Sequence, residues 1–403
     1  MSESCLARQP IFSSAGALIG YDIRFSETDD QNQAFAQSVL SGAFDLVRNK
    51  LPGFVSATRA QLVEDAFLMA APGAVVAMLP PALEVDGEVE AALRRYLDAG
   101  GHLALELVGE TATAVDRLAG RCTWLRIEVA TDDPSRIAAT CTRILNGLSA
   151  PRPKLIASNV NALSQYEAAL TQGFDGFHGA FFSRPEPLPA AQLPQSTVAA
   201  LRLLGMARDP KVTDPELEEV ISTDPVLTFQ LLRLVNSAAI GARGVASLGQ
   251  ALRLIGRTAF LRWLAVAIAS ARRSQTGVDR ELVRQAVERG RFLEQLAGGG
   301  RDPGTLFLVG LFSLLDAVFR LTMGDLLGRV ELSTEATDAL LHRTGPYADA
   351  LTFAESYELG LFENAEALAD DMGIDVGRIG EYYTNAVRWT SEALTAVQEG
   401  PGR

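Results

Sequence analysis

Charged and histidine side chains stand toward the ends of short β-rich runs in the first half of the chain. Three of them are the acids Asp22, Glu106 and Glu128, and the other two are Arg126 and His178. Carboxylates that converge are ligands for Mg²⁺, and a guanidinium group pairs with phosphate. These acids would support at most one weak, hydrated magnesium site. We favour the simpler interpretation that they are ordinary polar residues at strand ends, so we expect no metal and no cofactor.

The elements that must position these side chains alternate in type. Strand-like runs are separated by segments with helical apolar spacing, which predicts a parallel sheet, most simply a small or distorted (β/α) barrel. A short Ser-Ser-Ala-Gly turn joins the first two runs and favours an antiparallel hairpin. The predicted strands cover residues 5–12, 17–25, 54–55, 74–79, 102–108, 124–129, 154–157 and 174–177, and the predicted helices 34–47, 60–69, 88–99 and 135–148.

Strand-like runs almost disappear after a proline-rich segment. The residues from Ser183 to Ser196 include four prolines, which remove backbone donors and keep the chain extended. We therefore predict a barrel domain at residues 1–187, a Pro-rich linker at 188–195 and an all-helical domain at 196–403. The predicted helices of that domain cover residues 201–208, 216–222, 226–237, 248–270, 280–296, 306–321, 334–342, 347–361 and 376–397.

Composition restricts the partners and the compartment. The 403 residues are 48% hydrophobic, enough for two ordinary cores, and the net charge of −13 argues against non-specific attraction to nucleic acid or to anionic lipid. The three cysteines show no metal-ligand spacing, and their odd number argues against a disulfide framework. The first residues lack the basic and apolar runs of a signal peptide. We expect a cytoplasmic protein with no membrane span.

One stretch departs from the acidic character of the chain. Residues 241–275 contain six arginines and neither Asp nor Glu. Arg253 and Arg257 are one helical turn apart and are expected to share a face. With Arg243 and the preceding Asn236, they form a candidate interaction surface for an anionic partner or another domain. A solvated helix surface, with Asn236 only capping or bridging helix ends, is the simpler explanation.

The sequence from Asp224 to Leu264 is distinctive. The run DPVLTFQLLRLVNSAAIG and the later SLGQALRLIG have apolar residues at helical spacing on both sides of a glycine turn. This passage resembles the HDOD domain, a helical relative of the HD phosphohydrolases that generally lacks their metal site. An HD site needs several histidines and an aspartate, yet beyond residue 195 the chain offers only His342 and, in VGLFSLLDAVF, Asp316. We interpret Asp316 as a helix-capping or helix-bridging acceptor.

The first half resembles the EAL domain, the barrel that in active members hydrolyses cyclic di-GMP with divalent metals. The resemblance covers nearly all of residues 5–187 and is carried by ARQPIFSSAGALIGYDIRF, HLALELVG, WLRIEV and GFDGFHGAFFSRP. It implies that the signature glutamate corresponds to Asp22, the arginine after it to Ser26, the asparagine ligand to Ser56 and a further glutamate to Met78. The family's aspartate pair corresponds to Glu106 and Leu107, its lysine to Arg126 and the following aspartate to Glu128. Two later glutamates correspond to Ser158 and Asn161, and the closing glutamine corresponds to His178.

These replacements predict a protein that is not an enzyme, because methionine and leucine cannot hold a metal pair. We expect a bacterial signal transduction or scaffold protein in which a degenerate EAL domain and an HDOD domain bind protein partners. The alternative is a receptor that binds cyclic di-GMP without hydrolysis, with Asp22, Arg126 and His178 near the ligand. An active cyclic di-GMP phosphodiesterase is the least favoured hypothesis.

Overall fold

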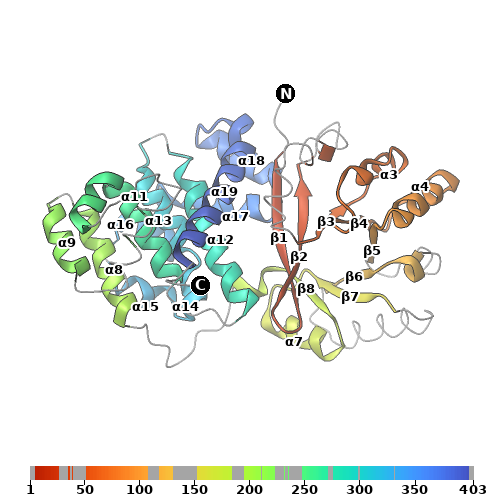
Figure 1. The fold of residues 1–403 in the computed structure, drawn as a ribbon, viewed down its shortest axis with the longest axis horizontal. Coiled ribbons are helices and arrows are strands. Elements are labelled where there is room, and N and C mark those ends of the chain that lie inside the picture. The colour runs from red at the N-terminus through yellow and green to blue at the C-terminus, as the bar shows by residue number, and fades with distance from the viewer. Residues whose placement is uncertain are drawn as a thin grey trace.

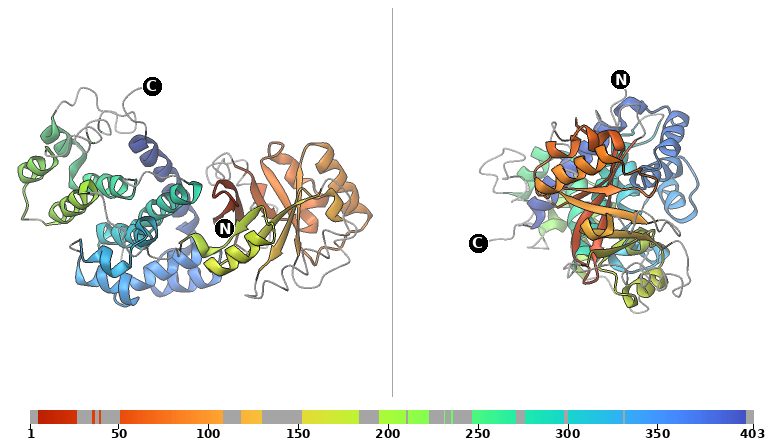
Figure 2. Two further views of the ribbon diagram at one scale, coloured as in Figure 1. Left: turned by 90° about the horizontal axis from the view of Figure 1, so that it is seen from below. Right: turned by 90° about the vertical axis from the view of Figure 1, so that its right-hand side faces the viewer.

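The structure is a computed structural model, and it has two parts. An eight-stranded barrel is followed by a helical region, and the two lie side by side along the long axis of the molecule (Figures 1 and 2). The predicted fold class is confirmed. The structure describes residues 5–26, 35–36, 39, 51–107, 118–129, 152–183, 195–209, 211–222, 231, 235, 247–270, 276–297, 300–330 and 332–398.

The barrel closes in sequence order. Strand β1 is antiparallel to both β2 and β8, and every other neighbouring pair is parallel. Each strand overlaps a predicted run, and the predicted hairpin is β1–β2. The strands are β1 (Leu6–Ser13), β2 (Leu18–Phe25), β3 (Gly53–Ser56), β4 (Val75–Leu79), β5 (His102–Leu107), β6 (Trp124–Glu128), β7 (Lys154–Ser158) and β8 (Gly176–His178).

Helical segments lie around the barrel. Asp86 begins α4 by accepting hydrogen bonds from the backbone N–H groups of Glu88 and Val89, which satisfies two donors that the helix itself cannot pair. The predicted helices at 34–47 and 135–148 fall almost entirely outside the described residues. The described helices are α3 (Arg59–Val63), α4 (Gly87–Asp98) and α7 (Leu163–Thr171), with 3₁₀ turns η1 (Ala66–Met69), η2 (Ala119–Arg121) and η3 (Ala180–Ser183).

The described elements of the second half are all helices or 3₁₀ turns. The predicted linker lies outside the described residues except for Gln195. The segment predicted at 226–237 is also mostly outside them. The helices are α8 (Gln195–Arg208), α9 (Asp214–Ser222), α11 (Leu248–Ser270), α12 (Gly277–Glu294), α13 (Pro303–Phe312), α14 (Leu315–Phe319), α15 (Met323–Leu327), α16 (Thr334–His342), α17 (Ala348–Glu358), α18 (Phe362–Asp371) and α19 (Ile379–Gln398), with the 3₁₀ turn η4 (Val376–Arg378).

Three local predictions for these helices are wrong. The helix predicted at 306–321 is two helices, because the chain leaves the helical path at Leu314, where φ is −125°. Helices α15 and α18 were not predicted. Gly256 has a φ of 73° and interrupts α11 between Arg253 and Arg257, so these two arginines do not share one regular helical face as expected.

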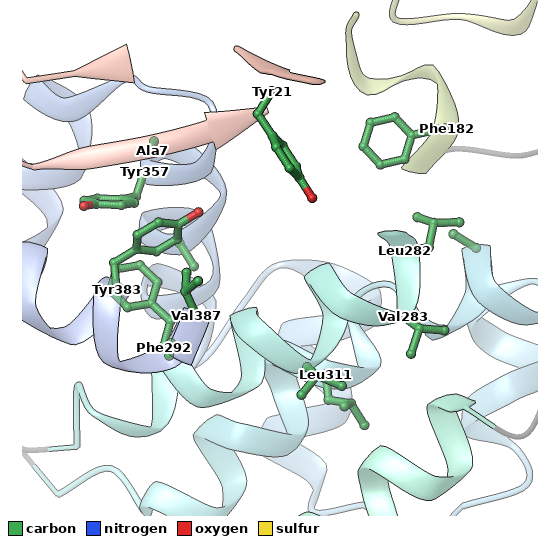
Figure 3. Close-up of a cluster of buried hydrophobic side chains, with 14 of the residues drawn as sticks. Ala7, Tyr21, Phe182, Leu282, Val283, Phe292, Leu311, Tyr357, Tyr383 and Val387 are labelled. Atoms are coloured by element: carbon green, nitrogen blue, oxygen red, sulfur yellow. The ribbon is translucent and has the colours of Figure 1, made fainter. Parts of the chain in front are cut away.

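Helix α12 is the centre of the helical region. Gly290 on α12 and Gly310 on α13 allow the two backbones to approach closely, since a Cβ added at Gly310 would lie 2.7 Å from Gly290. On another side of α12, Phe292 packs against Tyr357 and Tyr383, with ring centroids 5.0 and 5.5 Å away (Figure 3). Burial on several sides fixes this helix within the apolar core.

Buried ion pairs join α12 to the barrel hairpin. Arg8, on β1, is buried and pairs with Glu288 on α12. Tyr21, on β2, donates a hydrogen bond of 3.1 Å to Glu281. Arg284 pairs with both glutamates, so two buried carboxylates face two arginines. This charge balance offsets the cost of removing the carboxylates from water.

The hairpin also shares backbone hydrogen bonds with the helical region. The Tyr357 hydroxyl, on α17, accepts from the N–H of Leu6 at 3.3 Å and donates to the carbonyl of Leu6 at 3.1 Å. At the hairpin turn, the N–H of Val278 donates to the carbonyl of Gly16 at 3.1 Å. The helical region is therefore attached along the length of the hairpin. None of the described helices is both long enough and apolar enough to cross a bilayer.

We predict that Gly277→Ala weakens this attachment. A Cβ at Gly277, the first residue of α12, would lie 2.6 Å from the Gly16 carbonyl oxygen and 2.8 Å from the Leu18 nitrogen. We expect the free energy of unfolding to fall by about 1–3 kcal/mol in a denaturant titration. Gly87→Ala is the matched control, because Gly87 is also the first residue of a helix and its Cβ would meet no atom within 4 Å. Equal stability of the two variants would show that the hairpin and α12 are not in close contact.

Candidate functional site

The candidate site lies where the inward-facing side chains of the barrel change from apolar to polar. Alternate residues of a strand point inward, and the lower inward layer forms a separate apolar cluster. That cluster consists of Ile11, Phe54, Val76, Met78, Ala104 and Ile156. Glu106 is two residues after Ala104 on β5, and Arg126 on β6 is its partner in the β5–β6 register. The predicted residues Asp22 and His178 lie on β2 and β8, the strands on either side of β1.

Arg126 is the centre of this polar layer. Its Nη1 lies 3.2 Å from Asp22 Oδ1, and its Nε lies 3.5 Å from Glu106 Oε1. The side chain is only 8% exposed, so both attractions act in an environment with little water. The sequence predicted Asp22, Glu106, Arg126 and His178 as site positions, and the structure brings them together.

His178 is held in one orientation by a chain of hydrogen bonds. Gln9 donates its amide N–H to the carbonyl of Glu358, so the Gln9 oxygen faces the ring and lies 2.6 Å from His178 Nε2. On the other side of the ring, Arg126 Nη2 lies 3.4 Å from Nδ1. Both contacts are satisfied by a neutral imidazole that has its hydrogen on Nε2. The histidine thus connects the site to α17.

The ionisation of this layer follows from burial and from the arginines. Burial alone would raise the pKa of Asp22, but Arg126, His178 and Arg24 together hold it well below its usual range. Burial lowers the pKa of His178, Arg126 lowers it further, and the result is about 3. Near neutral pH, the layer therefore contains an aspartate anion, a guanidinium cation and a neutral histidine.

The side chains here do not fit the divalent metals that the EAL resemblance implies. Asp22 and Glu106 are both paired with Arg126, which occupies the position where a cation would be held. Glu128, the third acid considered, instead accepts a hydrogen bond from Asn159. Among the described residues, no group of three or more His, Cys, Asp or Glu side chains is placed to hold a metal ion.

A cavity of about 710 Å³ opens above this layer. One wall consists of the ends of β2–β6 and of Gln61 on α3, with Arg24 and Arg126 and the acids Asp22 and Glu106 among its polar residues. The other wall is the segment Gly360–Glu366 of the helical region. Arg24 bridges the walls, because its Nε lies 3.3 Å from Asp22 and its Nη1 donates to the carbonyl of Leu359 at 3.2 Å.

The other predicted positions have different surroundings. Ser26 and Ser56 line the cavity, and the Ser26 hydroxyl accepts from the N–H of Cys5 at 3.0 Å. Leu107 and Ser158 are buried and do not line the cavity. Asn161 accepts a hydrogen bond of 3.0 Å from the N–H of Ala180, so it orders the turn after β8.

Sequence reasoning missed Arg24, Gln61 and the whole wall from the helical region. Arg24 could have been found, because it is two residues after Asp22 and must therefore point to the same face of the strand. Helix α18 also had a signal, since Phe362, Ala365 and Ala369 repeat at helical spacing and are all buried. Its position at the barrel mouth depends on contacts between distant parts of the chain.

The predicted arginine-rich surface is only partly described. Asn236 and Arg243 lie outside the described residues. Arg253 is exposed, whereas Arg257 donates to the carbonyls of Asp209 and Val212 and so holds the α8–α9 connection. Asp316 lies in the first turn of α14 and accepts from the N–H of Ala317 at 2.7 Å, but it is not the N-cap residue, which is Leu314, so its expected role as a helix cap stays a prediction. Binding of a protein partner to this surface stays a prediction.

Comparison with known proteins supports the resemblance drawn from the sequence. Residues 193–358 match the family model of the HDOD domain, so the chain contains an HDOD domain. Cyclic di-GMP phosphodiesterase CdgJ of Vibrio cholerae is 26% identical over 245 residues, which are 60% of this chain and 56% of that protein. The uncharacterized protein YuxH of Bacillus subtilis is 22% identical over 97% of this chain and 99% of its own length.

Solved EAL structures resemble the first half. The EAL enzyme Bd1971, in its cAMP- and cyclic-di-GMP-bound form, is 13% identical, with a TM-score of 0.37 over 45% of this chain and 62% of that one. The PaMucR phosphodiesterase in complex with c-di-GMP is 18% identical, with a TM-score of 0.36 over 48% of this chain and all of that one. The relationship to CdgJ contradicts our expectation that this chain is not an enzyme, because that relative is named as a phosphodiesterase.

We predict that His178 makes the protein sensitive to acid. Its pKa is about 3 in the folded state and near 6.5 when unfolded, so the unfolded chain binds a proton that the native site rejects. The free energy of unfolding should therefore fall as the pH falls, by about 2 kcal/mol from this residue between about pH 7 and about pH 5. His178→Gln should remove that part of the slope in denaturant titrations. His102→Gln, at an exposed position on β5, is the control for losing a histidine. Equal slopes for wild type and His178→Gln would contradict this assignment.

Proposed function

We propose that this HDOD-containing chain is a cyclic di-GMP signalling protein that binds the nucleotide in the cavity between its barrel and its helical region. The observation that carries the proposal is the pair of arginines, Arg24 and Arg126, at the carboxyl ends of the barrel strands. Ligands of (β/α) barrels bind at this end. A guanidinium group offers paired donors that match phosphate oxygens.

The size and character of the cavity support this ligand class. Its volume of about 710 Å³ is within the ordinary range for small-molecule sites, roughly 300–1,000 Å³. Arg24 keeps 39% of its side chain exposed and can reach a phosphate at the rim. Arg126 is deeper, has little contact with water and is held in place by its ion pairs with Asp22 and Glu106, so it supplies fixed N–H donors at the bottom of the cavity.

The relationship to CdgJ also supports a role in cyclic di-GMP signalling. This chain spans 56% of the length of that protein. We therefore propose that the two proteins share binding of cyclic di-GMP, and not the whole activity. Because both parts of the chain line the cavity, a bound nucleotide would contact the barrel and the helical region together. We propose that nucleotide binding changes how the HDOD domain binds a protein partner.

Calorimetric titration of the full-length protein with cyclic di-GMP, with and without Mg²⁺, tests the proposal. We expect saturable binding, and Arg24→Ala should weaken it about tenfold, since one charge-assisted hydrogen bond to phosphate contributes about 1.5 kcal/mol or more. Arg94→Ala removes the same charge from an exposed site on α4 outside the cavity and should leave the affinity unchanged. An absence of binding under both conditions would refute the proposal.

Chromatography of the titrated samples measures hydrolysis independently of binding. Linear pGpG that accumulates with wild type and is lost with Glu106→Ala would assign the reaction to this cavity, because Glu106 lines it. Product that persists in Glu106→Ala would place the reaction elsewhere or in a contaminating enzyme.

A further inference from the structure

The two walls of the cavity differ in chemistry. The barrel wall contains the guanidinium groups of Arg24 and Arg126 with their partners Asp22 and Glu106, whereas the wall from the helical region carries no cation and contributes the side chains of Glu363, Asn364 and Glu366. Glu363 and Asn364 are exposed, and Glu366 is partly buried. Within the described structure, no hydrogen bond or ion pair involves these three side chains. They are therefore available to a ligand.

The first turn of α18 is held so that these side chains face the barrel. Phe362 and Ala365 are buried and anchor the helix in the core. Glu363 and Glu366 are three residues apart, so they lie on one face of the helix. Just before it, Gly360 has a φ of 72°, and a Cβ there would come within 2.5 Å of Arg24 Cδ. Glycine is favoured here, because it adopts this left-handed backbone without strain and leaves room for the side chain of Arg24.

The barrel wall gives an independent indication of a ligand. Arg126 Nε is buried and makes no hydrogen bond in the described structure, with Glu106 Oε1 as its neighbouring oxygen at 3.5 Å. The side chain is more than nine-tenths buried and lines the cavity. A buried donor without a hydrogen bond is costly, so a bound acceptor would stabilise it. The barrel wall thus has one buried donor without a hydrogen bond beside its own carboxylates Asp22 and Glu106, and the opposite wall carries two carboxylates that make no ion pair in the described structure.

We propose that Glu363 and Glu366 of the helical region read the guanine base of the nucleotide, while the barrel holds its phosphates. Guanine presents two adjacent donors on its Watson–Crick edge, N1–H and N2–H₂, which match the two oxygens of a carboxylate. Adenine presents the acceptor N1 at the corresponding position, which a carboxylate repels. The proposal rests on the proposed function and adds that the second domain determines which base is accepted.

Affinities of the full-length protein for cyclic di-GMP and cyclic di-AMP test this selectivity. We expect wild type to prefer cyclic di-GMP at least tenfold. The double variant Glu363→Gln/Glu366→Gln keeps the side-chain size. It should lower the affinity for cyclic di-GMP at least tenfold without lowering the affinity for cyclic di-AMP. Asp370→Asn/Asp371→Asn is the matched control, because it removes the same charge from exposed sites on α18 that do not line the cavity.

Each other outcome excludes one of the ideas. If the two glutamates only repelled anionic ligands, the double variant would bind both nucleotides more tightly, which would overturn base reading. Unchanged selectivity would also overturn it and leave the proposed function intact, since wild type would still bind cyclic di-GMP. No binding by wild type would refute both. Thermal melting of each variant checks that the protein remains folded.

Discussion

The ion pair between Arg8 and Glu288 is the interaction on which the geometry of the molecule depends. A buried arginine or glutamate without its partner is strongly unfavourable, with a cost of about 3–5 kcal/mol when one member is removed. Because Arg8 is on the first barrel strand and Glu288 is on the central helix of the second half, this penalty selects one arrangement of the two parts. The hydrogen bonds of Tyr21 and Tyr357 act in the same direction.

That arrangement determines the candidate site. Gln9, next to Arg8 on β1, bonds to the carbonyl of Glu358 and to the ring of His178, which lies 3.4 Å from Asp22. Asp22 in turn pairs with Arg126. A polar path therefore runs from α17 into the centre of the barrel mouth. Since every member is buried or partly buried, a shift of α17 relative to the hairpin would leave polar groups without partners.

Much of the fold could be predicted because it depends on local patterns. Alternation and turn residues located all eight strands, and the parity of each strand brought Asp22, Glu106 and Arg126 to one surface. The break at Gly256 was not predicted, because a glycine within an otherwise helical pattern is compatible with both a continuous and an interrupted helix.

The parts of the site that could not be predicted depend on contacts across long sequence separations. Nothing near Glu363 in the sequence indicates that it faces a barrel more than 200 residues earlier. The sequence could not show that Arg126 lies between Asp22 and Glu106, because this position depends on the register of β6 with its neighbours. Residue types alone also led to the expectation that the chain is not an enzyme, which the relationship to CdgJ contradicts. That expectation came only from comparing single positions with a family pattern.

The paired glutamates on α12 have a consequence for the evolution of this architecture. A domain that folds on its own completes its own core and surface. Here the surface of the helical module is completed by Arg8 and Tyr21 of the barrel, so a recombination event that replaced the barrel would leave Glu281 and Glu288 without these partners. A new barrel would pair with this helical module only if its first two strands carried a cation at the position of Arg8 and a hydrogen-bond donor at the position of Tyr21. The hairpin and α12 should therefore be inherited together, as one unit that crosses the domain boundary.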